Sequence, residues 1–188
     1  MSQENVEIVR QPLQGRTRSS RALDERLALR FPALTRANTR LLSKLPPTSR
    51  LRRAALSRAA LLSLWAYNRR DPEAAVAAWD PDFEYCPDRK WVEAGLVEPS
   101  YRGLAGYRRY IATADEVWGA ANSLTPVELI DLGDRIVILA DVSMRAQASG
   151  VPLTEAYGVV LAVKDGKVIH IQEYFDHAEA LEAVGLAE

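Results

Sequence analysis

One acidic residue, Glu173, lies on an otherwise apolar face of a predicted strand near the C-terminal end of the sequence. Side chains alternate between the two faces of a β-strand, so Glu173 is expected on the same face as Ile169, Ile171 and Phe175. Burying a lone carboxylate is costly, and burial raises its pKa towards neutrality. We therefore predict that Glu173 projects into a hydrophobic cavity and acts there as a general acid or base. The alternative interpretation is a structural carboxylate held by hydrogen bonds.

Two residues on the neighbouring predicted strand could reach the same cavity. Glu155 and Tyr157 occupy alternate positions of that strand and therefore share a face. Tyr157 could stabilise an oxyanion that develops beside Glu173, which makes these two the candidate catalytic residues. Glu155 could anchor a ligand, or it could lie at the solvated end of the strand.

Aromatic side chains are numerous in the sequence and could supply much of the cavity wall. Large rings also carry much of the buried area of a core, so most of them are expected to be structural. Trp91 lies in a predicted loop and is the candidate lid at the cavity mouth. Besides Glu155, the candidate ligand-pocket residues are Trp65, Trp79, Tyr85, Trp91, Tyr107, Trp118 and Tyr174.

The elements that position these residues are helical in the first part of the chain. Apolar residues at three- and four-residue spacing predict helices over residues 49–68, 71–79 and 104–118. Asp71 is the expected N-cap of the second helix, with Pro72 at its first position. A short strand is expected over residues 83–86, and a loop over 88–102.

The second part of the chain has the alternating pattern of extended strands. Strands are expected over residues 127–132, 135–146, 154–163 and 168–175. The pair Asp165-Gly166 marks a tight hairpin turn, because glycine adopts the positive φ that such a turn needs. Asp176 is the expected N-cap of a last helix. We therefore predict an α+β domain over residues 49–188, with helices packed on one face of a curved antiparallel sheet.

Residues 1–48 are predicted to be a partly helical N-terminal extension. Helices are expected over residues 20–29 and 35–45, the first of them ended by Pro32. Leu23, Leu27, Phe31 and Leu34 recur at three- and four-residue spacing, a pattern that predicts a packing stripe.

The extension is strongly basic, although the whole chain carries a net charge of −1. Residues 1–58 contain 13 Arg and Lys against 4 Asp and Glu, and residues 59–188 contain 11 against 21. A basic arm can contact nucleic acid or an anionic membrane, or it can dock on its own acidic domain or simply face solvent. The segment has no interleaved aromatic residues and no nucleic-acid motif, which favours the latter two alternatives.

Composition excludes several classes of protein. Hydrophobic residues make up 48% of the chain, yet no run approaches the roughly 20 apolar residues of a membrane span. Cys86 is the single cysteine, so no internal disulfide can form, and no secretory signal is recognisable at the N-terminus. We therefore expect a cytoplasmic protein. Two histidines are too few to predict a metal site, and we expect no cofactor.

The order of the predicted elements resembles the cone-shaped nuclear-transport-factor-2-like fold and, within it, the SnoaL-like group of small polyketide-cyclase relatives. The local motifs are Asn68-Arg69-Arg70-Asp71, Tyr101-Arg102-Gly103, Asp165-Gly166-Lys167-Val168 and Glu173-Tyr174-Phe175-Asp176. The resemblance covers roughly residues 50–188 and implies three helices packed on a curved sheet around a ligand cavity.

The functional residues of these relatives are only partly matched. The resemblance implies an acid seven positions after the hairpin glycine, and Glu173 occupies that position. The partnering histidine of the polyketide cyclases corresponds to Val159. The base of the neighbouring ketosteroid isomerases corresponds to Cys86-Pro87, with Asp88 one step on. Neither catalytic set is reproduced.

Two functions are compatible with the sequence. The first is a pocket protein that binds a small hydrophobic molecule and, if it is an enzyme, acts as a cofactor-independent isomerase, cyclase or hydrolase on a carbonyl compound. The second is a non-catalytic domain that binds a ligand or dimerises. A homodimer is expected through the open face of the sheet, on the row Val137, Leu139, Asp141, Ser143 and Arg145.

Overall fold

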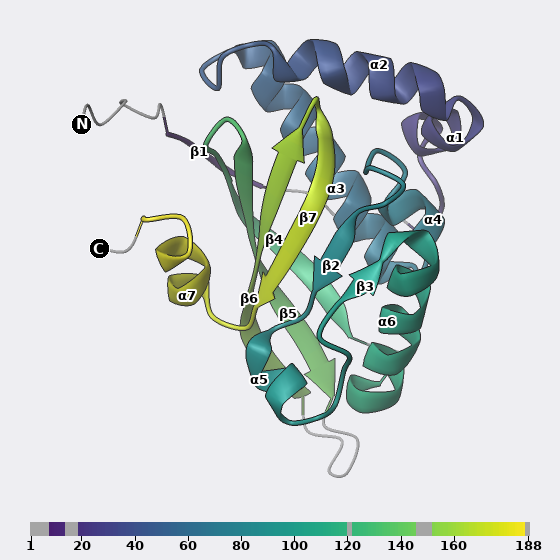
Figure 1. Ribbon diagram of the computed structural model, residues 1–188, viewed down its shortest axis with the longest axis vertical. Helices are drawn as coiled ribbons and strands as arrows, with labels where there is room; N and C mark the ends of the chain where they lie inside the picture. Colours follow the sequence, from purple (N-terminus) through teal and green to yellow (C-terminus); the bar gives the residue numbers. More distant parts are fainter. Residues whose placement is uncertain (1–7, 14–18, 120–121, 146–151, 187–188) are drawn as a thin grey trace.

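The computed structural model describes residues 8–13, 19–119, 122–145 and 152–186, and in them seven strands form one curved sheet (Figure 1). The strands are β1 (Val9–Pro12), β2 (Glu84–Cys86), β3 (Tyr101–Arg102), β4 (Ser123–Asp131), β5 (Arg135–Arg145), β6 (Pro152–Lys164) and β7 (Lys167–Tyr174). Their order across the sheet is β1-β4-β5-β6-β7-β2-β3. The predicted α+β class with a curved sheet is confirmed.

The β4–β7 meander forms where alternating apolar residues and turn residues predict it. Asp165 and Gly166 both adopt positive φ, 51° and 74°, as a two-residue hairpin turn requires. The strand β2 then pairs in parallel with β7, with Tyr85 opposite Ile171. This pairing brings the segment after β2 to the end of β7 that carries Glu173.

A bulge in β7 changes which residues face the core. Ala162 of β6 pairs with His170, but the next residue, Val163, pairs with Val168, so Ile169 is the extra residue. Ile169 is exposed, whereas Ile171 and Glu173 are buried. The prediction that Ile169 shares the face of Glu173 is therefore wrong, because the bulge shifts the alternation by one position.

The helices begin close to the predicted caps. They are α1 (Leu23–Arg30), α2 (Pro32–Ser43), α3 (Arg50–Asn68), α4 (Pro72–Ala75), α5 (Arg89–Glu93), α6 (Gly103–Trp118) and α7 (His177–Glu182). The side chains of Ser49, Asp71 and Asp176 each accept a hydrogen bond from a backbone N–H in the first turn of their helix. α4 ends at Ala75, earlier than predicted, and α2 begins at Pro32.

The predicted loop over residues 88–102 contains two elements, α5 and β3. Asp88 caps α5, because its Oδ1 accepts the N–H of Lys90 at 2.7 Å. Its Oδ2 accepts the N–H of Phe175 at 2.7 Å, which ties α5 to the end of β7. The sequence signal for this cap, Pro87-Asp88, precedes only five helical residues, too few to show a helical period.

Helices cover both faces of the sheet (Figure 1). α3, α4 and α6 pack on the concave face around the larger core, and α7 packs on the outer face of β5–β7. Val137 and Leu139 are buried beneath α7 in a second cluster with Ala180 and Val184. Part of the row expected to form a dimer interface is therefore covered by the chain itself. A Cβ at Gly158 would lie 2.8 Å from that of Ala180, so glycine permits this close packing.

The N-terminal extension contributes an unpredicted strand to the sheet. β1 pairs antiparallel with β4, with Val9 opposite Asp131, and forms one edge of the sheet. α2 lies across the tip of the β6–β7 hairpin (Figure 1), where a Cβ at Gly166 would meet the carbonyl of Thr39 at 2.5 Å. The extension therefore packs directly on the domain.

The predicted packing stripe of the extension does not pack. Leu23, Leu27, Phe31 and Leu34 are all exposed to solvent. Leu23 and Leu27 lie one turn apart on α1, whereas Phe31 is the non-helical residue between the two helices and Leu34 lies on α2. Periodicity does not show whether such residues meet the domain or face solvent. No helix among the described residues is both long enough and apolar enough to cross a membrane.

Candidate functional site

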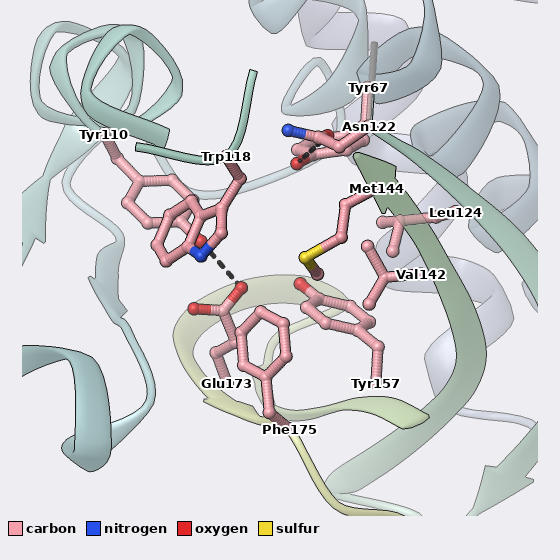
Figure 2. Close-up of a pocket in the computed structure, with 10 residues that line it drawn as sticks. All are labelled: Tyr67, Tyr110, Trp118, Asn122, Leu124, Val142, Met144, Tyr157, Glu173 and Phe175. Carbon is pink, nitrogen blue, oxygen red and sulfur yellow. Dashed lines mark hydrogen bonds between the residues drawn. The ribbon is translucent and has the colours of Figure 1, made fainter. Parts of the chain in front are cut away.

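The carboxylate of Glu173 is buried at the centre of a hydrogen-bonded group of tyrosines (Figure 2). Glu173 is 2% exposed and projects from β7 towards α6. Its Oε1 accepts hydrogen bonds from the hydroxyls of Tyr110 on α6, at 2.7 Å, and Tyr85 on β2, at 3.0 Å. Its Oε2 accepts the N–H of Asp88 at 3.3 Å. Three separate elements thus fix the position of the carboxylate.

Burial raises the pKa of Glu173 to about 7, while the hydrogen bonds from Tyr110 and Tyr85 oppose the rise. Both protonation states are therefore populated near neutral pH, as a general acid or base requires. Burial also raises the pKa of Tyr85, Tyr110 and Tyr157 well above the usual value of a phenol, and the charge of Glu173 adds to the rise. These hydroxyls stay protonated and remain donors.

Tyr157 extends the same network. Its hydroxyl lies 3.4 Å from that of Tyr85, and its ring packs edge-on against Phe175 with centroids 5.6 Å apart. The two candidate catalytic residues, Glu173 and Tyr157, therefore line one small cavity, with the Tyr157 hydroxyl directed into it (Figure 2).

The cavity itself is nearly filled by side chains. Its volume is about 10 Å³, which is room for about one water molecule. It is lined by Tyr67, Tyr110, Trp118, Asn122, Leu124, Val142, Met144, Tyr157, Glu173 and Phe175. The sequence predicts an apolar hollow at Glu173, and the structure places apolar walls there but closes the space between them.

An aromatic cluster closes the end of the cavity next to α5. The ring of Trp91 packs edge-on against Trp118 and Phe175, with centroids 4.8 and 5.2 Å away. Trp118 and Phe175 are stacked at 6.2 Å. The indole Nε1 of Trp91 is buried and has no hydrogen-bond partner among the described residues. Trp91 thus packs against two rings that line the cavity but does not line it itself.

Several candidate pocket residues lie elsewhere. Trp79 and Tyr107 pack with Phe83 in the core and do not line the cavity. Trp65 is buried beneath the guanidinium of Arg58. Spacing along the sequence indicates which face of an element carries a ring, but not how far that ring lies from the cavity. For this reason the prediction includes these core rings among the pocket residues.

Two further candidates lie outside the pocket for reasons of strand geometry. Glu155 lies opposite Val142, on the inner side of the sheet, but it is exposed, in agreement with the solvated strand-end alternative. Tyr174 follows Glu173 directly and therefore faces the other side of β7, where it packs against the cluster under α7. It does not line this cavity.

Tyr110 makes the shortest hydrogen bond to Glu173 but is not among the candidate site residues predicted from the sequence. It lies three positions after Tyr107 and four before Ala114, on the face of α6 that packs on the sheet. Tyr67 is also missed; it lines the cavity and donates to Oδ1 of Asn122 at 2.9 Å. The helical spacing of Tyr107, Tyr110 and Ala114 could have indicated Tyr110. The contact between Tyr67 and Asn122 joins residues 55 positions apart, and no neighbouring residue indicates it.

A second group of polar side chains lies on the outer face of β2 and β7. Glu84, Cys86 and His170 place one ligand atom each within 4.8 Å of one another. Nδ1 of His170 is 3.6 Å from a carboxylate oxygen of Glu84. Burial raises the pKa of the Cys86 thiol. The sequence identifies no histidine beside Cys86, because the parallel β2–β7 pairing that joins them spans more than eighty residues.

Comparison with known proteins supports the architecture. A family model described as a SnoaL-like domain matches residues 60–171. The crystal structure of TerC co-crystallised with polyporic acid is 26% identical, with a TM-score of 0.57, and the match covers 66% of this chain and 94% of that one. No curated protein sequence matches this chain.

Two further solved structures share the fold. An NTF2-like protein of unknown function from Burkholderia pseudomallei is 25% identical with a TM-score of 0.56, over 68% of this chain and 95% of that one. A protein with a ketosteroid isomerase-like fold from Catenulispora acidiphila is 16% identical with a TM-score of 0.52, over 68% and 92%.

Proposed function

The chain belongs to the SnoaL-like domain family, and we propose that it binds a small hydrophobic carbonyl compound beside Glu173 and transfers a proton on it. One observation carries the proposal: a fully buried carboxylate with a pKa of about 7 is held by phenol donors at the end of an apolar cavity. Such a group accepts a proton at neutral pH and can return it.

The chemistry follows from the positions of these groups. The Glu173 carboxylate takes a proton from the carbon next to the ligand carbonyl, and the electron pair of the broken C–H bond forms an enolate. The hydroxyl of Tyr157 donates a hydrogen bond to the enolate oxygen. Protonated Glu173 then returns the proton to another carbon, which isomerises the ligand. If the enolate carbon instead attacks a second carbonyl of the ligand, a ring closes and Glu173 protonates the new alkoxide.

Ligand entry requires the aromatic cluster to move. The cavity of about 10 Å³ admits about one water molecule, so a ligand must displace the rings of Trp118 and Phe175. Both are only partly buried and lie beneath Trp91. The unpartnered Nε1 of Trp91 would become available as a donor once these rings separate.

A second candidate function is non-catalytic ligand binding. The three hydrogen bonds to the Glu173 carboxylate favour it over catalysis, because a satisfied buried carboxylate can have a purely structural use. Exchange of ligand protons with solvent separates this function from the first.

We expect a carbonyl ligand to raise the melting temperature of the protein in a thermal-shift screen of ketones, lactones and aromatic polyketides that includes polyporic acid, the compound crystallised with TerC. A ligand at about 100 times its Kd adds about 2.7 kcal/mol, which raises Tm by roughly 5–10 °C for a chain of this size. Where the bound compound carries hydrogen on the carbon next to its carbonyl, the wild type should then exchange these α-protons with D2O, as followed by NMR.

The matched pair of variants is Glu173→Gln and Glu155→Gln. Glu173→Gln should abolish exchange, whereas Glu155→Gln, at an exposed site on the same face, should leave it unchanged. Binding without exchange in the wild type would establish the non-catalytic alternative. Absence of any thermal shift across the screen would contradict both functions.

A further inference from the structure

The N-terminal helices carry an exposed apolar surface. Five large apolar side chains of α1, α2 and Phe31, the residue between the two helices, are exposed to solvent, and exposed apolar side chains gathered in one part of a protein mark an interaction site. Leu23, Leu34 and Leu41 are 72%, 69% and 66% exposed. The apolar stripe consists of Leu23, Leu27, Phe31, Leu34 and Leu41.

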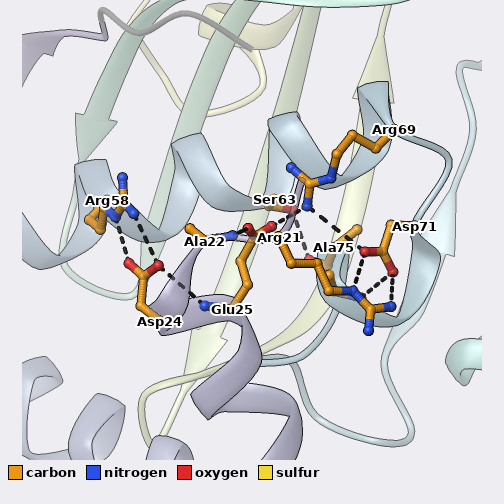
Figure 3. Close-up of polar contacts among 10 residues, drawn as sticks. Arg21, Ala22, Asp24, Glu25, Arg58, Ser63, Arg69, Asp71 and Ala75 are labelled. Carbon is orange, nitrogen blue, oxygen red and sulfur yellow. Dashed lines mark hydrogen bonds and ion pairs between the residues drawn. The ribbon is translucent and has the colours of Figure 1, made fainter. Parts of the chain in front are cut away.

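The two acidic residues of α1 point towards Arg58 of α3 and towards Arg69, which follows α3 (Figure 3). Asp24 and Glu25 are the only two acidic residues in the sequence from position 8 to position 58. Asp24 accepts two hydrogen bonds from Arg58, at 2.6 and 3.0 Å, and Glu25 pairs with Arg69. Both carboxylates are thus paired with arginines of the domain, and these ion pairs hold α1 against it.

Basic side chains accompany the apolar stripe on the solvent side. Arg26 and Arg30 of α1, Arg40 of α2 and Lys44 just after it are all exposed. The solvent side of α1 and α2 therefore combines apolar side chains with positive charge, and its one partly exposed acid, Asp24, is paired with Arg58. This combination is typical of helices that lie in the interface of an anionic membrane.

We propose that the apolar stripe and its flanking basic residues bind an anionic lipid surface. The leucines and Phe31 insert among the acyl chains near the headgroups, and the arginines contact lipid phosphates. A second copy of the chain is disfavoured as the occupant, because it would bring the same positive charges face to face. Nucleic acid would use the arginines but would leave the five apolar side chains in water.

Vesicle co-sedimentation of the full chain tests this proposal. We expect the protein to sediment with phosphatidylcholine vesicles that contain about 30% phosphatidylglycerol, and not with phosphatidylcholine alone. Raising NaCl from about 0.05 M to about 0.5 M should weaken binding, because salt screens the attraction.

The matched variants exchange exposed leucines for glutamine. Leu34→Gln with Leu41→Gln should lower the vesicle affinity about tenfold or more, whereas Leu96→Gln with Leu153→Gln, also at exposed leucines, should leave it unchanged. Unaltered circular dichroism would show that both pairs fold. Failure of the wild type to sediment with anionic vesicles would overturn the proposal, as would a dimer that Leu34→Gln and Leu41→Gln dissociate.

An independent observation points to a divalent metal site on the outer sheet face. We infer that Glu84, Cys86 and His170 bind Zn²⁺ through one carboxylate oxygen, the thiolate and an imidazole nitrogen, with water as a fourth ligand. The three ligand atoms already lie within 4.8 Å of one another on adjacent parallel strands. Small side-chain rotations would bring them to the ligand distances of zinc, about 2.0–2.3 Å from the ion.

Titration with Co²⁺ in place of Zn²⁺ tests the metal site in the full chain. We expect a thiolate-to-cobalt charge-transfer band, which Zn²⁺ then abolishes by displacement. Cys86→Ser should remove the band and His170→Gln should weaken metal binding, whereas His177→Gln, on α7, should change neither. Absence of the band in the reduced wild type would overturn the inference.

Discussion

Glu173→Gln is expected to remove about 2–3 kcal/mol of pH dependence from the free energy of unfolding between pH 5 and pH 8. Burial raises the pKa of Glu173 from 4.5 to about 7 in the folded state. Between these values the folded protein holds a proton that the unfolded chain releases. The wild type is therefore most stable, relative to the glutamine variant, below pH 4.5, and it loses this advantage as the pH rises to 7.

Urea unfolding of wild type and variant at pH 5 and pH 8 measures the effect. The difference between the two proteins isolates Glu173 from the other titrating groups, which both proteins share. Glu155→Gln is the control, because Glu155 is exposed and its replacement should give the same difference at both pH values. A Glu173→Gln difference independent of pH would show that the buried carboxyl does not titrate in this range.

Arg52→Ala is expected to destabilise the fold by about 3–5 kcal/mol, because it leaves the carboxylate of Asp131 buried without its partner. Arg52 is 5% exposed and donates two hydrogen bonds to Asp131, at 2.7 and 2.8 Å. It also donates to the carbonyls of Ser43, Leu45 and Gly133. One side chain thus joins the end of α2, the start of α3 and the sheet.

Chemical unfolding with a matched surface variant tests this role. Arg50→Ala, two residues earlier on the same helix and exposed, should cost less than about 0.5 kcal/mol. Arg52→Ala with Asp131→Leu should recover part of the loss, since the uncompensated charge is gone while the three carbonyls remain unpaired. Equal stability of Arg52→Ala and Arg50→Ala would contradict the structural role.

The sequence predicts the domain architecture and the acidic residue of the site for local reasons. The Asp165-Gly166 turn and the caps at Asp71 and Asp176 depend on neighbouring residues, so they can be recognised from the chain alone. The inward orientation of Glu173 follows from alternation along β7.

The remaining features depend on contacts between distant segments. The bulge at Ile169 arises from the pairing of β6 with β7, and no residue type in β7 predicts it. Tyr110 and Tyr85 meet at Glu173 only after α6 and β2 have packed on the sheet. Periodicity also assigned the stripe of α1 and α2 to packing, because an apolar helix face looks the same whether a core or a membrane covers it.

The proposed lipid-binding surface and the proposed ligand cavity lie at opposite ends of the sheet. α2 crosses the β6–β7 turn, whereas α5 and the aromatic cluster lie at the other end of β7 (Figure 1). A chain attached to a lipid surface by α1 and α2 would therefore keep the end with α5 and Trp91 away from that surface. A hydrophobic ligand could enter without hindrance from the lipid.

The position of β1 has a consequence for the order of folding during synthesis. Val9 is made 122 positions before its partner Asp131, so β1 must wait for its partner strand while most of the domain emerges from the ribosome. Pairings this distant along the chain close slowly, because a long loop must first be ordered. β1 is made before the other strands of the sheet and is thus among the last to be locked in place.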